Sequence, residues 1–85
     1  MPVVSLELKE DVARFVKTKA VRDRTDEATV LKDLVETGFE QRLRELHKEY
    51  QEGEISLGYL AEQLGVTTWR VYHLLEERGL RTANV

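Results

Sequence analysis

Hydrophobic and polar residues alternate strictly at the start of the chain and take up a helical spacing further on. The alternating positions are Val3, Val4, Ser5, Leu6, Glu7 and Leu8. A period of two is typical of a half-buried β-strand, here with Val4, Leu6 and Leu8 on its apolar side. The chain offers no convincing second strand, and a lone strand leaves its N–H and C=O groups unpaired. We therefore expect residues 3–8 to pair with the same strand of a second molecule about a two-fold axis; the alternative is a frayed tail.

The helical spacing predicts two amphipathic helices after this segment. The first covers about residues 10–21, and its apolar stripe is formed by Val12, Phe15, Val16 and Ala20. The second follows Thr25, which we expect to be its N-cap. Its stripe is formed by Ala28, Leu31, Leu34, Val35, Phe39, Leu43, Leu46 and Tyr50. Gly38 interrupts this stripe, and we favour a close helix crossing there over a helix end, because the spacing continues beyond it.

The last third of the chain predicts two short helices joined by a sharp corner. After Gly53 has ended the long helix, Ser56 is placed to cap a helix that ends at Leu64. Gly65 supplies the positive φ angle that a sharp turn needs, and Thr67 caps a further helix over about residues 68–77. The apolar positions that such a corner buries are Leu60, Leu64, Val66, Val71 and Leu74. This spacing is typical of a helix-turn-helix.

The stretches "VSLELKEDV" and "TDEATVLKDLVETGFEQRL" resemble the opening strand and the second helix of the ribbon-helix-helix family, over roughly Val3 to Leu46. In that family two chains share a two-stranded ribbon over four interlocked helices. The resemblance implies that Val3, Ser5 and Glu7 enter a major groove and that the helix start at Thr25 holds a phosphate. The family commonly has basic or amide side chains where this chain has Val3 and Glu7, and glutamate repels phosphate. A merely solvated face at Ser5 and Glu7 is the alternative.

These patterns together predict a mainly α protein with one N-terminal β-strand. The expected architecture is a ribbon-helix-helix-like intertwined dimer that carries a C-terminal helix-turn-helix in each chain. Residues 1–50 would form the dimerisation unit, and residues 51–85 would form the helix-turn-helix unit. The residues expected to hold the two copies together are Val4, Leu6, Leu8, Leu31, Val35 and Phe39.

The helix expected over residues 68–77 is the candidate recognition helix. The residues that it and its cap would present to DNA are Thr67, Thr68, Trp69, Arg70, Tyr72 and His73. Thr68 would pack on a thymine methyl group, Arg70 would pair with a guanine edge, and His73 would meet a phosphate. Alternatively, Trp69 folds back onto the core, Arg70 pairs with Glu62 or with a glutamate of its own helix, and Tyr72 covers Leu80.

The segment "YQEGEISLGYLAEQLGVTTWRVYHLLEERGL" is similar to the tail of a prokaryotic family of small antitoxin-like proteins, through its phrases "EGEIS" and "LEERGL". Many members of that family are encoded beside PIN-domain ribonuclease toxins. The resemblance implies DNA binding with autoregulation, toxin neutralisation, or both. We therefore predict a homodimeric, sequence-specific DNA-binding transcriptional regulator. The alternative is a protein-interaction module whose C-terminal helices bind and neutralise a partner such as a nuclease toxin.

Charge divides unevenly along the chain, although the total is only -3. Residues 1–24 carry +2, residues 25–54 carry -5, and residues 55–85 are neutral. A free-standing nucleic-acid module is usually basic, and only the first segment is so here. Its cations include Lys17, Lys19, Arg22 and Arg24. They fit phosphate contact and stabilisation of a helix C-terminus equally well.

Composition excludes several classes of function. The chain has two histidines, no cysteine and no Gly-rich phosphate loop after a strand, so we expect neither an enzyme nor a cofactor. Glu45 and Glu49 on one helix face are expected to be a solvated surface rather than metal ligands. The absence of cysteine suits a reducing cytoplasm, and the longest apolar runs are too short for a membrane helix. The expected partners are double-stranded DNA, a second copy of the chain and a toxin protein, but not a membrane.

Overall fold

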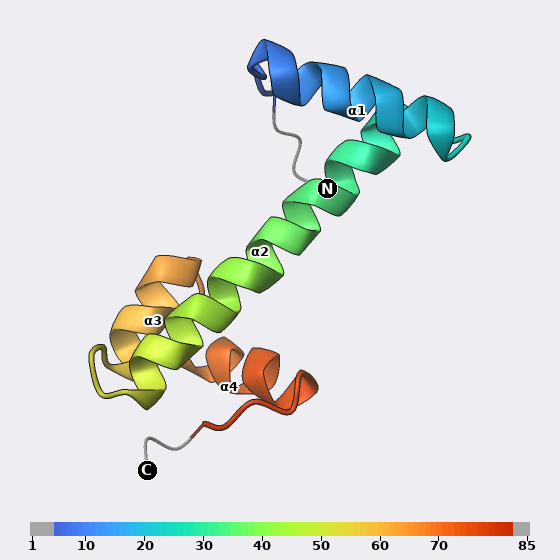
Figure 1. The fold of residues 1–85 in the computed structure, drawn as a ribbon. Helices are drawn as coiled ribbons and strands as arrows, with labels where there is room; N and C mark the ends of the chain where they lie inside the picture. Colours follow the sequence, from blue (N-terminus) through green and yellow to red (C-terminus); the bar gives the residue numbers. More distant parts are fainter. Residues whose placement is uncertain (1–4, 83–85) are drawn as a thin grey trace. The chain divides into compact units, whose positions relative to one another are not determined.

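The computed structural model of the chain describes residues 5–82, and these residues form four α-helices (Figure 1). The helices are α1 (Glu10–Arg22), α2 (Glu27–Gln51), α3 (Leu57–Leu64) and α4 (Thr68–Glu77). Each agrees with a helix that hydrophobic spacing and capping residues predict, to within two residues at either end. None of the described helices is long and apolar enough to cross a membrane.

The predicted N-terminal strand is wrong. Residues 5–9 have no regular secondary structure, and residues 5–82 contain no strand; Val3 and Val4 lie outside the described residues. A strand needs a neighbour to bond its N–H and C=O groups, and residues 5–82 supply none, so the alternating pattern has no ladder to join. The described part of the chain is therefore all-α. The predicted ribbon-helix-helix-like intertwined architecture depends on that strand and is wrong as well.

The chain divides into two compact units, Met1–Thr37 and Gly38–Val85, called unit 1 and unit 2 below. The boundary between them falls inside α2, which runs without a break through Gly38. A Cβ atom added to Gly38 would have no neighbour within 4 Å among the described residues. The close helix crossing predicted at Gly38 therefore does not occur within the described part of the chain.

Unit 1 is built from α1 and the first part of α2, and its core is very small. Of its described residues, only Val16, Ala20 and Val30 are buried, with Leu31 packed against them. A tight corner joins the two helices: the N–H of Thr25 donates to the Ala20 carbonyl at 2.9 Å, and Arg24 takes a left-handed φ of 53°. This arrangement closes α1 in the way that glycine usually does.

The start of α2 is capped by Asp26, not by Thr25 as predicted. The helix begins at Glu27, and the Asp26 carboxylate accepts a hydrogen bond from the N–H of Thr29 at 2.7 Å. Hydrogen bonds from Thr29 also lower the pKa of Asp26. The cap lies one residue later than predicted because Thr25 is held in the corner by its own N–H.

Unit 2 packs the second part of α2 against α3 and α4. One cluster holds Leu46, Tyr50, Leu60, Ala61, Val71 and Leu75, and Leu43 is fully buried as well. The predicted corner residues Leu64 and Val66 and the more distant Leu80 cover its edges. The core of this unit is therefore contributed by three helices, and α2 supports the corner between α3 and α4.

Candidate nucleic-acid interface

The corner between α3 and α4 forms as its residues predict. Ser56 caps α3 by accepting a hydrogen bond from the N–H of Tyr59 at 3.0 Å. Gly65 ends the helix with φ at 70°, in the left-handed region that glycine enters without steric cost. Thr67 then caps α4, accepting a hydrogen bond from the N–H of Arg70 at 3.1 Å. Three residues, 65–67, thus redirect the chain from one helix into the next.

One face of α4 is buried and the other is open to solvent. Val71, Leu74 and Leu75 face the core of unit 2. All six residues predicted for DNA contact are exposed; they are Thr67, Thr68, Trp69, Arg70, Tyr72 and His73. The structure thus brings these six together on one helix and its cap.

Trp69 is the most prominent of them. Its side chain is 71% exposed, so the alternative in which it folds onto the core does not hold. The His73 ring lies one turn along the helix and meets the indole edge-on, with 5.0 Å between the ring centres and an interplanar angle of 80°. This contact orients the indole at the surface and leaves most of its area free for a partner.

Arg70 is half exposed and only loosely held. Its nearest acid is Glu77, at 3.8 Å, on the same helix. Ion pairs this long between exposed side chains contribute little to stability, so a phosphate or a guanine edge would displace Glu77 easily. Arg70 makes no ion pair with Glu62, the acid that the sequence offered on the preceding helix. The Arg70 guanidinium is therefore free to reorient.

Contacts between residues far apart in the sequence, which no local pattern predicts, hold α4 and the segment after it against α2. The first is an ion pair of Arg78 with Glu40. Arg78 donates through Nε to the Glu40 carboxylate at 2.7 Å and through a second nitrogen to its other oxygen, and it also donates to the Leu74 carbonyl at 2.8 Å. The hydrogen bond from Arg78 lowers the pKa of Glu40 and raises that of Arg78. These residues lie 38 positions apart, so no local pattern in the sequence links them.

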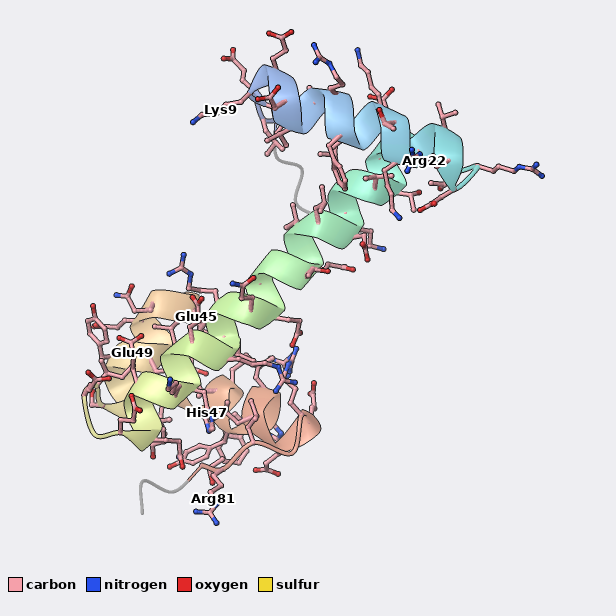
Figure 2. The ribbon with its side chains drawn as sticks, in the orientation of Figure 1. Lys9, Arg22, Glu45, His47, Glu49 and Arg81 are labelled. Atoms are coloured by element: carbon pink, nitrogen blue, oxygen red, sulfur yellow. The ribbon has the colours of Figure 1, made fainter. Side chains whose placement is uncertain are left out.

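The chain after α4 is held by side chains of α2. The Tyr50 hydroxyl donates to the Thr82 carbonyl at 2.6 Å, and His47 Nε2 lies 2.7 Å from the Arg81 carbonyl oxygen. Figure 2 shows His47 and Arg81 at this meeting point. Unit 2 thus secures both ends of α4: the cap and corner at its start, and Arg78 with the α2 side chains beyond its end.

The remaining predicted DNA-contact residues, Ser5, Glu7 and Thr25, belong to unit 1. All three are exposed, Ser5 and Glu7 in the irregular segment before α1. Without a strand, the predicted route of Ser5 and Glu7 into a groove is lost. The phosphate contact at Thr25 stays a prediction, and the carboxylate of Asp26 at the same helix start disfavours an anion there.

The residues predicted for dimerisation largely come together, though without a strand. Leu6, Leu8, Leu31 and Val35 line one groove of about 510 Å³ in unit 1. The other residues that line it are Ala28, Lys32 and Glu36. Phe39 is exposed in unit 2, and Val4 lies outside the described residues.

The described residues contain no group of three or more acidic or histidine side chains placed to hold a metal ion. Glu45 and Glu49, which Figure 2 labels on α2, are the pair that the sequence singled out; Arg42 lies 3.7 Å from Glu45. The exposed face of α4 offers hydrogen bonding, aromatic contacts from Trp69 and His73, and the cation of Arg70.

Comparisons of the chain with protein-family models, with curated proteins and with solved structures found no match.

Proposed function

We propose that unit 2 binds double-stranded DNA by placing α4 in the major groove. The observation that carries the proposal is the exposed face of α4, which begins at a capped corner and presents Trp69, Arg70 and His73 opposite a fully buried face. A helix that follows a tight, glycine-turned corner and rests on a third helix is the usual means of entering a groove. In the cell this role would place the chain in the cytoplasm, as a regulator of transcription.

Each exposed residue has a role that fits base or backbone recognition. Arg70 is long enough to pair with the O6 and N7 atoms of guanine, and Thr68 suits a thymine methyl group. The N–H groups of the first turn of α4, next to Thr67, would meet a phosphate. Trp69 and Tyr72 would contact sugars and base edges through their apolar rings.

The charge of unit 2 sets the expected salt dependence. Residues 38–85 hold six Lys and Arg side chains against eight Asp and Glu side chains. Each phosphate contact adds a slope of about -0.9 to a plot of log affinity against log salt concentration. We therefore expect a shallow slope, with most of the discrimination coming from base contacts on α4.

The test selects bound duplexes from a pool of random-sequence double-stranded DNA and measures mobility shift at several salt concentrations. Arg70→Ala should weaken binding to the selected duplex by roughly 1–3 kcal/mol. Arg14→Ala is the matched control, because Arg14 is also an exposed arginine paired to a glutamate of its own helix, but in unit 1. Equal losses in both variants, or no enrichment of any duplex, would contradict the proposal.

A second candidate function is binding of a partner protein, such as a nuclease toxin, by the same face. The exposure of Trp69 favours it, because tryptophan and tyrosine dominate the energetics of protein interfaces. The acidic balance of unit 2 would then suit a basic partner. A salt slope near zero for DNA, together with a tight partner that co-purifies and is lost in Trp69→Ala, would favour this second function.

A further inference from the structure

We infer that unit 1 is a self-association surface on which a second copy of the chain packs antiparallel along the first part of α2. The surface is the groove lined by Leu6, Leu8, Leu31 and Val35, with Lys32 and Glu36 at its edge. Self-association of unit 1 would stand whether or not unit 2 binds DNA.

The described residues of unit 1 bury little apolar surface. Three of the described residues of unit 1 are buried, Val16, Ala20 and Val30, and they offset only a small part of the conformational entropy of ordering more than thirty residues, which costs on the order of 1 kcal/mol each. Further apolar burial from outside would stabilise such a unit. Small domains meet this need with disulfides, metals or oligomerisation. The chain has no cysteine, and the described residues hold no metal cluster.

The groove in unit 1 is lined by apolar side chains that are exposed to solvent. Val35 is 60% exposed, and Leu6 and Leu8 are exposed beside it. Leu31 sits between the groove and the small core, partly buried. A surface of contiguous apolar side chains marks an interface when it is rimmed by charges, as this one is.

The charged residues at the edge of the groove fit a second copy of the chain. Lys32 and Glu36 are one helical turn apart on the same flank of α2, and neither makes an ion pair among the described residues. A two-fold axis near residue 34 would bring the same flanks of two antiparallel helices together. Lys32 of each copy would then face Glu36 of the other, twice in one dimer. A second copy is also present wherever the chain is made, as a partner required for folding must be.

The first experiment measures the mass of the full chain by sedimentation equilibrium across a micromolar concentration range. We expect twice the 9.9 kDa of one chain. Val35→Glu should weaken the dimer at least about tenfold, which is 1.4 kcal/mol. Val21→Glu is the matched control, since Val21 is a 78% exposed valine of unit 1 outside the groove, and it should leave the dimer unchanged.

A charge swap keeps the inference testable if Val35→Glu also loosens unit 1. Lys32→Glu and Glu36→Lys, each alone, place like charges together across the two-fold axis and should weaken the dimer. The double variant restores unlike charges in both pairs and should recover most of the wild-type affinity. Such recovery distinguishes a second copy from a foreign partner, whose own charges would not change.

Three results would overturn the inference. A monomer at every concentration would remove the interface altogether. A dimer weakened equally by Val21→Glu and Val35→Glu would place it elsewhere. Failure of the double charge variant to recover affinity beyond that of the single variants would rule out the antiparallel pairing.

Discussion

Gly65 and Arg24, two of the described residues with left-handed backbone conformations, both end a helix but do so at different energetic cost. Gly65 ends α3 with φ at 70°, and Arg24 follows α1 with φ at 53°. Glycine enters this region freely, whereas a residue with a Cβ atom is strained there by roughly 1–2 kcal/mol. The corner of unit 2 is therefore relaxed, and the corner of unit 1 is not.

Arg24→Gly should stabilise unit 1 by about 1 kcal/mol, because it relieves this strain while keeping the Thr25–Ala20 hydrogen bond. Gly65→Ala should destabilise unit 2 by about the same amount for the opposite reason. Urea denaturation followed by circular dichroism measures both. An unchanged or lower midpoint for Arg24→Gly would show that the corner is not strained as the backbone indicates.

Glu40 gives unit 2 a defined dependence on pH. Arg78 holds the pKa of this carboxyl below its ordinary value in the folded chain. A group with a lowered folded pKa contributes stability that is fully present above its unfolded pKa and is lost as the pH falls through the folded pKa. The melting temperature of the wild type should therefore fall more steeply in acid than that of Glu40→Gln, and the two should converge. Parallel curves over the acid range would contradict the role of this ion pair.

At the scale of helices, the capped corner of α3 and α4 and the long course of α2 follow from local signals. Ser56, Gly65 and Thr67 each act within four residues of their own position, so the sequence alone predicts them. The strand predicted over residues 3–8 is wrong, because local alternation cannot show whether a distant neighbour is present to pair with it. The Arg78–Glu40 contact depends on packing in the same sense, and the exposure of Trp69 depends on which side of α4 the core takes.

Substitutions on the two faces of α4 should separate stability from function. Leu75→Ala removes a fully buried side chain and should cost about 2–5 kcal/mol of unfolding free energy. Trp69→Ala removes an exposed one and should cost under about 0.5 kcal/mol, while weakening the binding of DNA or a partner protein. Thermal unfolding measures the change in stability of both variants. A large loss of stability in Trp69→Ala would mean that the indole belongs to the core after all.

At the scale of the whole chain, the two units differ in how much they can support alone. Unit 2 has a core drawn from three helices, whereas three residues are buried in the part of unit 1 that the structure describes. Regions with few buried apolar contacts open at low free energy. Unit 1 is therefore expected to be the less stable unit and to depend on the concentration of the chain through self-association.

Hydrogen exchange should report this difference directly. Amides of α1 should exchange faster than those of α3 and α4, and their protection should rise with protein concentration while that of unit 2 stays constant. The Val35→Glu variant should lose the concentration dependence. Protection of α1 equal to that of α4 at low concentration would contradict the predicted weakness of unit 1.

The most direct measurement on the central proposal uses Trp69 itself, since it is the one tryptophan of the chain and lies on the face of α4 proposed to meet DNA. A duplex selected from random-sequence DNA is titrated into the full chain while the emission of the indole and its quenching by acrylamide are followed. The account predicts a saturable change in emission and a loss of quenching at the concentrations where the duplex binds, both shifted to higher concentration in Arg70→Ala. Bound duplex with Trp69 still fully open to acrylamide would contradict it.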